Sequence, residues 1–243
     1  PSNAKVHSYP LYEKYGLIWI WMGNTALADH HDIFEIKHYD NPSWGINRGD
    51  AMELECNYLL MCDNLLDPTH VAWVHAGSFG QAATKSAPLR VKKTNDGVIV
   101  HRWMMDVEPA PFYKKVVGFN GNCDRLQHYE VRYPSNALIK AIFTPAGTGG
   151  SEGKLHDDVF IMDSYNFMTP VTESKTRYYW FQLRNIRPDD AELSQLMTDD
   201  VQQAFEEDRN VLNEVQKGMT NKTSPHIDLP IDAGQLRFRR QLQ

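Results

Sequence analysis

The middle of the chain alternates between strand-like and turn-like segments. Stretches rich in β-branched and aromatic residues predict five consecutive strands, with turns such as Pro134-Ser135-Asn136 and Gly147-Thr148-Gly149-Gly150 between some of them. The predicted strands cover residues 97–105, 126–133, 137–144, 158–168 and 176–184. Strands that follow one another in this way favour a single antiparallel sheet. A further strand is predicted earlier, over residues 16–23.

A long amphipathic helix is predicted after these strands. It follows Pro188, has Asp189 and Asp190 near its start, and has Gly218 near its end. Its apolar residues recur in steps of three and four: Leu193, Leu196, Met197, Val201, Phe205, Leu212, Val215 and Met219. A helical stretch around residues 63–76 precedes the strands, so the order of elements predicts an α+β fold.

One position on the apolar face of the long helix carries a charge. Between Phe205 and Leu212 the periodicity places Asp208 on the inward face. A buried carboxylate without a partner is too unfavourable to persist. The neighbouring Arg209 cannot be assumed to neutralise it, because successive helical residues project about 100° apart. A basic side chain from elsewhere, a proton or a metal ion could each meet Asp208, and the helix alone does not choose among them.

The overall charge argues against two classes of partner. The formal net charge is −6, and no Lys/Arg cluster supplies the basic face that nucleic acid or an anionic membrane would require. The three cysteines form no Cys-x-x-Cys motif, which favours a reducing compartment, and Cys56 and Cys62 lie in an apolar stretch that suggests buried thiols. No apolar run reaches the roughly 18 residues of a membrane span, and residues 1–10 do not resemble a signal peptide. We therefore expect a soluble, cytoplasmic protein.

Two histidines with a nearby carboxylate provide candidate metal ligands. His70 and His75 lie in an apolar setting close to Asp67, and two imidazoles with one carboxylate form the facial triad of non-haem Fe(II) sites. Asp67-Pro68 has the pattern of an N-cap followed by proline, which predicts a short helix from residue 68 to about 76. On an ideal helix the two imidazoles would diverge by about 140°, so convergence needs an irregular turn or a histidine at the helix end. Taken alone, such a pair is more often structural, and Trp73 is expected in the core.

The pattern Asn64-x2-Asp67-x2-His70-x4-His75 closely resembles the iron-site motif of Rieske non-haem iron oxygenases, particularly the oxygenase components similar to vanillate O-demethylase. In that family the third iron ligand is an aspartate between an acidic and a basic residue on a late helix, and Glu207-Asp208-Arg209 resembles that context. Other similar segments occur in the same order along the chain: Tyr9-Pro10, Tyr15-Gly16-Leu17-Ile18-Trp19-Ile20-Trp21, Pro145-Ala146-Gly147-Thr148-Gly149, Met168-Thr169-Pro170, Tyr178-Tyr179-Trp180 and Ile231-Asp232-Ala233-Gly234.

The resemblance implies a fold, a metal site and partners. The fold would be a helix-grip (START/Bet v1-like) catalytic domain, with an antiparallel sheet packed on long helices. His70, His75 and Asp208 would hold Fe(II) beside O₂ and an aromatic substrate. Asp67 would accept a hydrogen bond from a ligand histidine and face the cluster of a neighbouring subunit in a homo-oligomer, expected to be a trimer. Its alternative role is that of a helix N-cap. Asn64 would lie near the metal or satisfy local backbone.

The sequence departs from the family pattern in one respect. Family members carry an N-terminal Rieske domain whose [2Fe–2S] cluster needs Cys-x-His and Cys-x-x-His pairs, and neither pair occurs here. Residues 1–24 resemble the last part of that domain and residues 25–243 the catalytic domain. We expect the cluster in a preceding portion rather than a naturally cluster-free protein. Electrons from NADH would then arrive through a separate reductase.

The substrate contacts are predicted from the order of residues along the sheet. Asn166 is the expected polar contact, and Ile139, Ala141, Phe143 and Phe167 are the other candidates, although strand alternation turns only some of them inward. The resemblance favours O-demethylation of a vanillate-like methoxybenzoate. The alternatives are N-demethylation, aryl-methyl hydroxylation and ring hydroxylation at the same iron. A metal-free helix-grip module that only binds an apolar ligand is another alternative, and it would require a basic partner for Asp208.

Overall fold

The chain divides into two compact units. The computed structural model describes residues 4–85, 87–118, 121–223 and 225–242, and the division between the units falls after Asn41. In the first unit, β1 (Leu11–Lys14) and β2 (Leu17–Ile20) pair as an antiparallel hairpin. The predicted strand over residues 16–23 is therefore shorter than expected, and the compact division comes later than the predicted boundary at residue 24.

The second unit is built on one large sheet. Within the described residues it has eight strands in the order β3-β10-β9-β8-β7-β6-β5, with β4 also paired to β10, and every pairing is antiparallel. The strands are β3 (Gly45–Arg48), β4 (Met52–Leu54), β5 (Arg90–Lys93), β6 (Gly97–Val107), β7 (Cys123–Arg132), β8 (Asn136–Pro145), β9 (Phe160–Thr172) and β10 (Lys175–Arg184). The five predicted strands are confirmed as β6 to β10. The sequence analysis missed the three short strands, which offer too few residues for a pattern.

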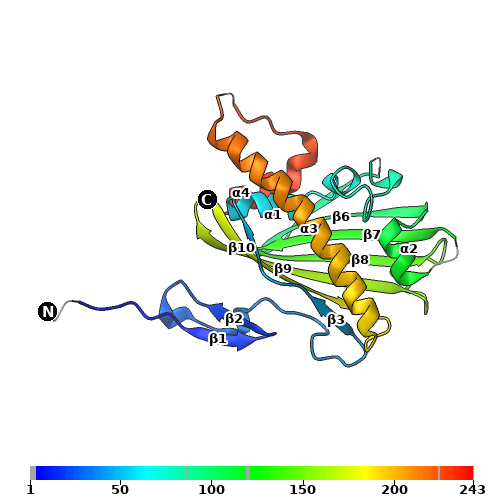
Figure 1. Ribbon diagram of the computed structural model, residues 1–243, viewed down its shortest axis with the longest axis horizontal. Helices are drawn as coiled ribbons and strands as arrows, with labels where there is room; N and C mark the ends of the chain where they lie inside the picture. Colours follow the sequence, from blue (N-terminus) through cyan, green and yellow to red (C-terminus); the bar gives the residue numbers. More distant parts are fainter. Residues whose placement is uncertain (1–3, 86, 119–120, 224, 243) are drawn as a thin grey trace. The chain divides into compact units, whose positions relative to one another are not determined.

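Four α-helices accompany the sheet in the described part of the second unit. They are α1 (Tyr58–Leu65), α2 (Pro111–Val117), α3 (Ala191–Thr220) and α4 (Ala233–Gln241). The long helix α3, drawn in orange in Figure 1, lies across the sheet and also contacts β3, β4, α1 and α2. Its prediction is confirmed, and the structure shows Asp190 as its N-cap, where the carboxylate accepts a hydrogen bond of 2.8 Å from Leu193 N.

The inward face of α3 packs on β10. The Phe205 ring lies edge-on to the rings of Tyr178 and Trp180, each at 5.2 Å between centroids. Most of the stripe between Leu193 and Leu212 is buried, and Asp208 is among the buried residues as the periodicity predicted. Its prediction is wrong at Leu196, Val215 and Met219, which are partly exposed. Val215 and Met219 lie in the last turns of the helix, beyond the buried stretch.

The cysteines and the apolar character of the helices agree with the sequence. All three cysteines are buried and free, and burial raises the pKa of Cys56 and Cys123 to about 11. In the described ranges, no helix combines the length and the apolar character that crossing a bilayer requires. The antiparallel sheet and the long helix α3 across one of its faces form a helix-grip arrangement.

Two glycines test whether the sheet and helix are as tightly packed as described. A Cβ at Gly97 would lie 2.1 Å from Val131 O, whereas a Cβ at Gly218 would meet nothing within 4 Å. We expect Gly97→Ala to lower the free energy of unfolding by about 1–3 kcal/mol, because strand backbone cannot yield without breaking the ladder. Gly218→Ala should leave it equal or slightly raise it, because alanine favours helix. Urea unfolding of both variants measures this, and equal effects would contradict the packing.

Candidate metal centre

The two histidines lie on an irregular turn after α1. The helix ends at Leu65, and only His70–Ala72 then form a 3-10 turn. The predicted helix over 63–76, and the shorter one from 68, are therefore wrong. Pro68 disfavours helical backbone at Asp67, and the Asp67 carboxylate accepts hydrogen bonds from the backbone N–H, at 2.8 Å, and the hydroxyl of Thr69.

The far end of this turn is held by the backbone of His75. Its carbonyl accepts hydrogen bonds from Ser78 N at 3.1 Å and Gly80 N at 2.8 Å. A side chain at Gly80 would lie 2.7 Å from Val71 O, so the chain closes on itself there. This is the irregular turn that the five-residue spacing required for the imidazoles to converge.

The structure brings the three predicted ligands together. His75 Nε2 lies 3.1 Å from Asp208 Oδ1, and His70 Nε2 lies 3.6 Å from the same oxygen. The two imidazole rings meet edge-on at 5.2 Å. His75 and Asp208 are buried and His70 nearly so. A turn near the start of the unit and a helix near its end thus meet at one point.

Each imidazole is oriented by a partner on its other nitrogen. His70 Nδ1 donates to the backbone carbonyl of Asp67, and His75 Nδ1 donates to Glu207 Oε2 at 2.7 Å. A carbonyl or a carboxylate can only accept, so these bonds place the ring proton on Nδ1 when the ring is neutral. Both Nε2 atoms then present lone pairs toward Asp208 Oδ1. Three acceptor atoms face one another with no proton between them.

This arrangement fits a metal ion. Asp208 Oδ1 is buried and has no hydrogen-bond partner among the described residues. Ligand atoms about 2.1 Å from a shared metal lie about 3.0 Å apart at a right angle and about 3.4 Å apart at a tetrahedral angle. The 3.1 and 3.6 Å separations are close to these values. Two imidazole nitrogens and one carboxylate oxygen are also the donor set of non-haem iron.

The electrostatics of His75 point the same way. Burial lowers the pKa of this imidazole, but the hydrogen bonds and charges of Asp208 and Glu207 outweigh burial and raise it. The site therefore attracts positive charge. A metal cation would compete with a proton for the same nitrogen.

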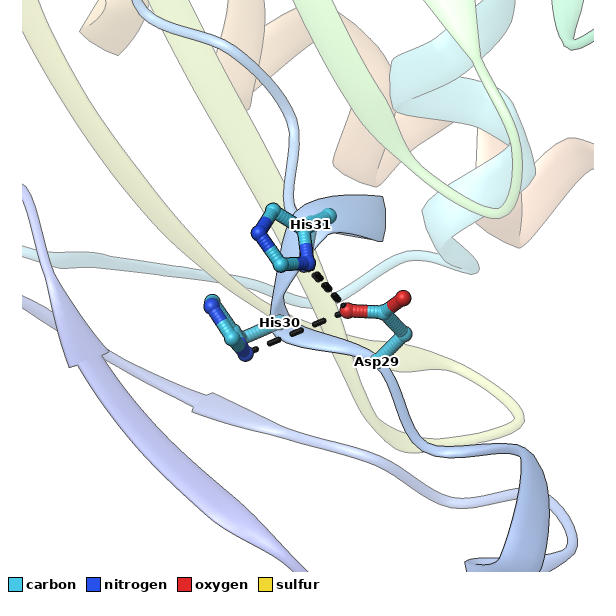
Figure 2. Close-up of side chains that lie close together, drawn as sticks. All are labelled: Asp29, His30 and His31. Atoms are coloured by element: carbon cyan, nitrogen blue, oxygen red, sulfur yellow. Dashed lines mark hydrogen bonds and ion pairs between the residues drawn. The ribbon is translucent and has the colours of Figure 1, made fainter.

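A second group of possible ligands lies in the first unit. Figure 2 shows Asp29, His30 and His31 with their side chains gathered at the start of a 3-10 turn. These side chains are exposed by 55, 50 and 78%. Asp29 Oδ1 already accepts hydrogen bonds from His31 N and the His31 ring, which lower the pKa of Asp29. This group is a satisfied N-cap and does not need a cation.

A pocket opens onto the buried centre. Its walls come from helices and sheet, and they carry aromatic, aliphatic and polar side chains. The lining includes Asn64, His70, His75, Phe79, Tyr113, Arg125, Tyr129, Ile139, Met162, Ser164, Gln182, Phe205 and Asp208.

The predicted substrate contacts fall into three groups. Ile139 lines the pocket, and Ala141 and Phe143 follow on the same face of β8, where the Phe143 ring lies 4.0 Å from that of Tyr113. Asn166 is fully buried just beyond Ser164, accepting from the Tyr178 hydroxyl at 2.5 Å. Phe167 is a wrong prediction, because strand alternation puts it on the opposite face, next to Phe181.

The remaining predicted residues have mixed outcomes. Asn64 lines the pocket, and its buried Nδ2 has no hydrogen-bond partner among the described residues. At Asp67 the backbone carbonyl, not the expected carboxylate, accepts from His70, because the carboxylate is turned toward Thr69. Trp73 is 70% exposed rather than in the core. Arg209 pairs with Glu206 and does not neutralise Asp208.

Two residues of the site were missed. Glu207 was considered only as the acidic residue next to Asp208 in the motif. Nothing in the helix pattern predicted its hydrogen bond with His75. Arg125 lies on β7 at an inward position, on the same face of the strand as Gln127 and Tyr129. A charged residue on the inward face of a buried strand was the available signal.

Comparisons with known proteins agree with this geometry. Residues 54–243 match the family of vanillate O-demethylase oxygenase C-terminal domains. The iron–sulfur subunit of a toluene-4-sulfonate monooxygenase system from Comamonas testosteroni is 32% identical over 96% of this chain and 68% of its own length. A vanillate O-demethylase oxygenase subunit from a Pseudomonas species is 33% identical over 97% of this chain and 68% of its own length.

Solved structures support the fold. Dicamba monooxygenase bound to 3,6-dichlorosalicylic acid superposes with a TM-score of 0.89 at 24% identity, over the whole of this chain and 71% of that one. The fold and site therefore define the catalytic domain of a Rieske non-haem iron oxygenase, an oxidoreductase. Within that class, this chain belongs to the vanillate O-demethylase oxygenase family.

The two groups of possible ligands can be separated by metal analysis. We expect His70→Ala and Asp208→Ala each to weaken Fe(II) binding by more than about tenfold, because a ligand is lost. Asp29→Ala is the matched control and should retain the iron of the parent protein. Iron content after anaerobic loading and desalting measures all three. Iron retained by Asp208→Ala but lost from Asp29→Ala would move the site to the first unit.

Proposed function

We propose that this chain is the iron-bearing catalytic part of an oxygenase that removes the methyl group of an aromatic methyl ether. The observation that carries this proposal is the convergence of His70, His75 and Asp208 at an aromatic-lined pocket. The vanillate O-demethylase relative supports the reaction class and suggests a methoxybenzoate as substrate.

The residues have distinct roles in this proposal. His70, His75 and Asp208 would hold Fe(II), which would supply the activation of O₂. Asp67 O and Glu207 would keep the two imidazoles oriented, each through an Nδ1 proton. Aromatic side chains such as Tyr113 and Phe205 would hold the ring and exclude water.

The overall reaction balances with an external source of electrons. Aryl methyl ether, O₂, two electrons and two protons give a phenol, formaldehyde and water, because the hydroxylated methyl carbon is a hemiacetal that breaks at its C–O bond. The electrons would come from NADH through a separate reductase and a Rieske [2Fe–2S] cluster. Residues 1–243 contain neither of the Cys/His pairs for that cluster. In this proposal residues 1–24 are the end of a Rieske domain and residues 25–243 the catalytic domain.

Electron delivery would involve Asp67 across a subunit boundary. A trimeric ring would bring the cluster of one subunit to the iron of the next. Asp67 lies three residues before the first ligand histidine, and its carboxylate accepts from Thr69 while its carbonyl accepts from His70 Nδ1. Its charge also reaches the buried Arg102.

The metal-free alternative would need a protonated histidine opposite Asp208. No Lys or Arg among the described residues forms an ion pair with Asp208, whose neighbours are the two imidazoles. A module that only binds an apolar ligand would therefore depend on a proton at His75 to compensate this carboxylate, whereas a metal ion would engage both imidazoles and the carboxylate together. N-demethylation, aryl-methyl hydroxylation and ring hydroxylation use the same iron and are distinguished by product.

Product analysis tests the reaction class. We expect Fe(II)-loaded protein given 4-hydroxy-3-methoxybenzoate, O₂ and a chemical reductant to release formaldehyde and the matching catechol in equal amounts. Asp208→Ala is the control and should release neither. A product that keeps the methyl group and gains a hydroxyl on the ring would contradict demethylation and favour ring hydroxylation.

A charge-removing change at Asp67 separates stabilisation of the local turn from an electron-transfer role. Asparagine keeps an acceptor oxygen for the N–H and hydroxyl of Thr69, so Asp67→Asn should change stability by only a few tenths of a kcal/mol. The carbonyl that orients His70 is unchanged, so iron content should also remain. If the carboxylate serves electron delivery, reductase-driven turnover should fall by at least about tenfold, corresponding to 1.4 kcal/mol. Turnover equal to that of the parent enzyme would leave only the stabilisation of the turn at Thr69.

A further inference from the structure

A buried cation on the pocket wall has no counter-charge. Arg125 is 2% exposed and lines the same pocket as His70, His75 and Asp208. Among the described residues, no carboxylate lies within 4.0 Å of its guanidinium. The other side chains that line the pocket are either neutral or part of the metal centre. Arginine keeps its charge under all physiological conditions, so it cannot relieve this burial by losing a proton.

The guanidinium is held in place but is not saturated. Nη1 donates to Gln81 Oε1 at 2.6 Å and to Phe79 O at 3.3 Å, while Nε finds no hydrogen-bond partner in the part of the chain that the structure describes. The rings of Tyr113 and Phe143 lie 4.9 and 5.2 Å from the guanidinium carbon. Neutral amide oxygens and aromatic faces fix its position without cancelling its charge.

Two other buried arginines differ from Arg125 in their surroundings. Arg102, on the neighbouring strand β6, uses Nε and both terminal nitrogens on Gln127, Ala87 and Pro68, and it has the charge of Asp67 nearby. Arg184 has unpaired nitrogens, but the charge of Asp190 is near and the residue does not line the pocket. Arg125 alone among these three faces the space where a ligand would lie.

The metal centre cannot supply the missing negative charge. A bound divalent ion would engage the Asp208 carboxylate, so the centre as a whole would be cationic. Glu207 is committed to His75 at 2.7 Å. With iron present, the pocket would hold two separate positive sites and no free anion.

We propose that Arg125 binds the anionic group of the aromatic substrate, a carboxylate or a sulfonate. The planar fork of the guanidinium matches two oxygens of such a group, and burial strengthens the contact. The ring of the ligand would lie along the aromatic wall with its other end toward the iron ligands. This inference rests on the proposed function for the reacting end but concerns only which aromatic compounds bind.

Paired ligands of equal size test the charge requirement. Binding of 4-methoxybenzoate and its neutral isostere 4-methoxybenzamide would be measured by calorimetry on anaerobic Fe(II)-loaded protein without reductant. Toluene-4-sulfonate and toluene-4-sulfonamide form a second pair that distinguishes a planar from a tetrahedral anion. We expect at least one anion to bind the parent protein more tightly than its neutral partner.

Substitution of Arg125 tests whether this residue is responsible for the preference for an anionic ligand. Arg125→Met keeps a straight side chain between Tyr113 and Phe143, and it should weaken the preferred anion by about 10- to 100-fold while leaving the neutral isostere unchanged. Arg125→Lys, which keeps the charge but loses the fork, should lie between them and serves if the methionine variant does not fold. Arg132→Met removes the same charge from the same strand outside the pocket and should bind as the parent does.

Two results would overturn the inference. One is that neither anion binds the parent protein more tightly than its isostere. The other is that Arg125 substitution weakens the anion and the isostere equally, which would indicate a loss of shape. Failure of the proposed function is separate, because an absence of formaldehyde would not alter anion binding that depends on Arg125.

Discussion

The site depends on a carboxylate that the fold buries among acceptor atoms. Asp208 occupies an inward position of α3, and its nearest neighbours are imidazole nitrogens whose protons are held on the far side of each ring. Neither hydrogen bonding nor an arginine or lysine compensates it within the described residues. The Asp190 cap and the packing of Phe205 on β10 fix the helix, so the carboxylate cannot turn away. The carboxylate and the two Nε2 atoms together form a donor set that fits a metal cation.

Much of this was accessible from sequence because it is periodic. The five long strands and α3 extend over enough residues for alternation or a helical repeat to emerge, and the repeat itself singled out Asp208. His70 and His75 were predicted from their residue type and from the family resemblance. The family motif also predicted Asp208 as the third ligand. Local pattern and family motif agreed at that residue for independent reasons.

The features that were missed depend on contacts rather than on periodicity. The turn after α1 is set by the Asp67 carboxylate and by the close approach at Gly80, neither of which gives a repeat. Glu207 acquires its role only because His75 lies opposite it. The pattern on α3 continues past Leu212, but the core does not, so Val215 and Met219 are half-exposed. Phe167 was misassigned because only alternation along the folded strand decides its face.

The sheet side of the pocket and the metal ligands belong to different elements. His70, His75 and Asp208 come from one turn and one helix, whereas Arg125, Tyr129, Ile139 and Ser164 come from consecutive strands of the sheet. Inward side chains of those strands can be exchanged in place, because the ladder that carries them does not depend on their identity. With this division, substitutions on the strands can change which ligands fit the pocket without moving the three metal ligands.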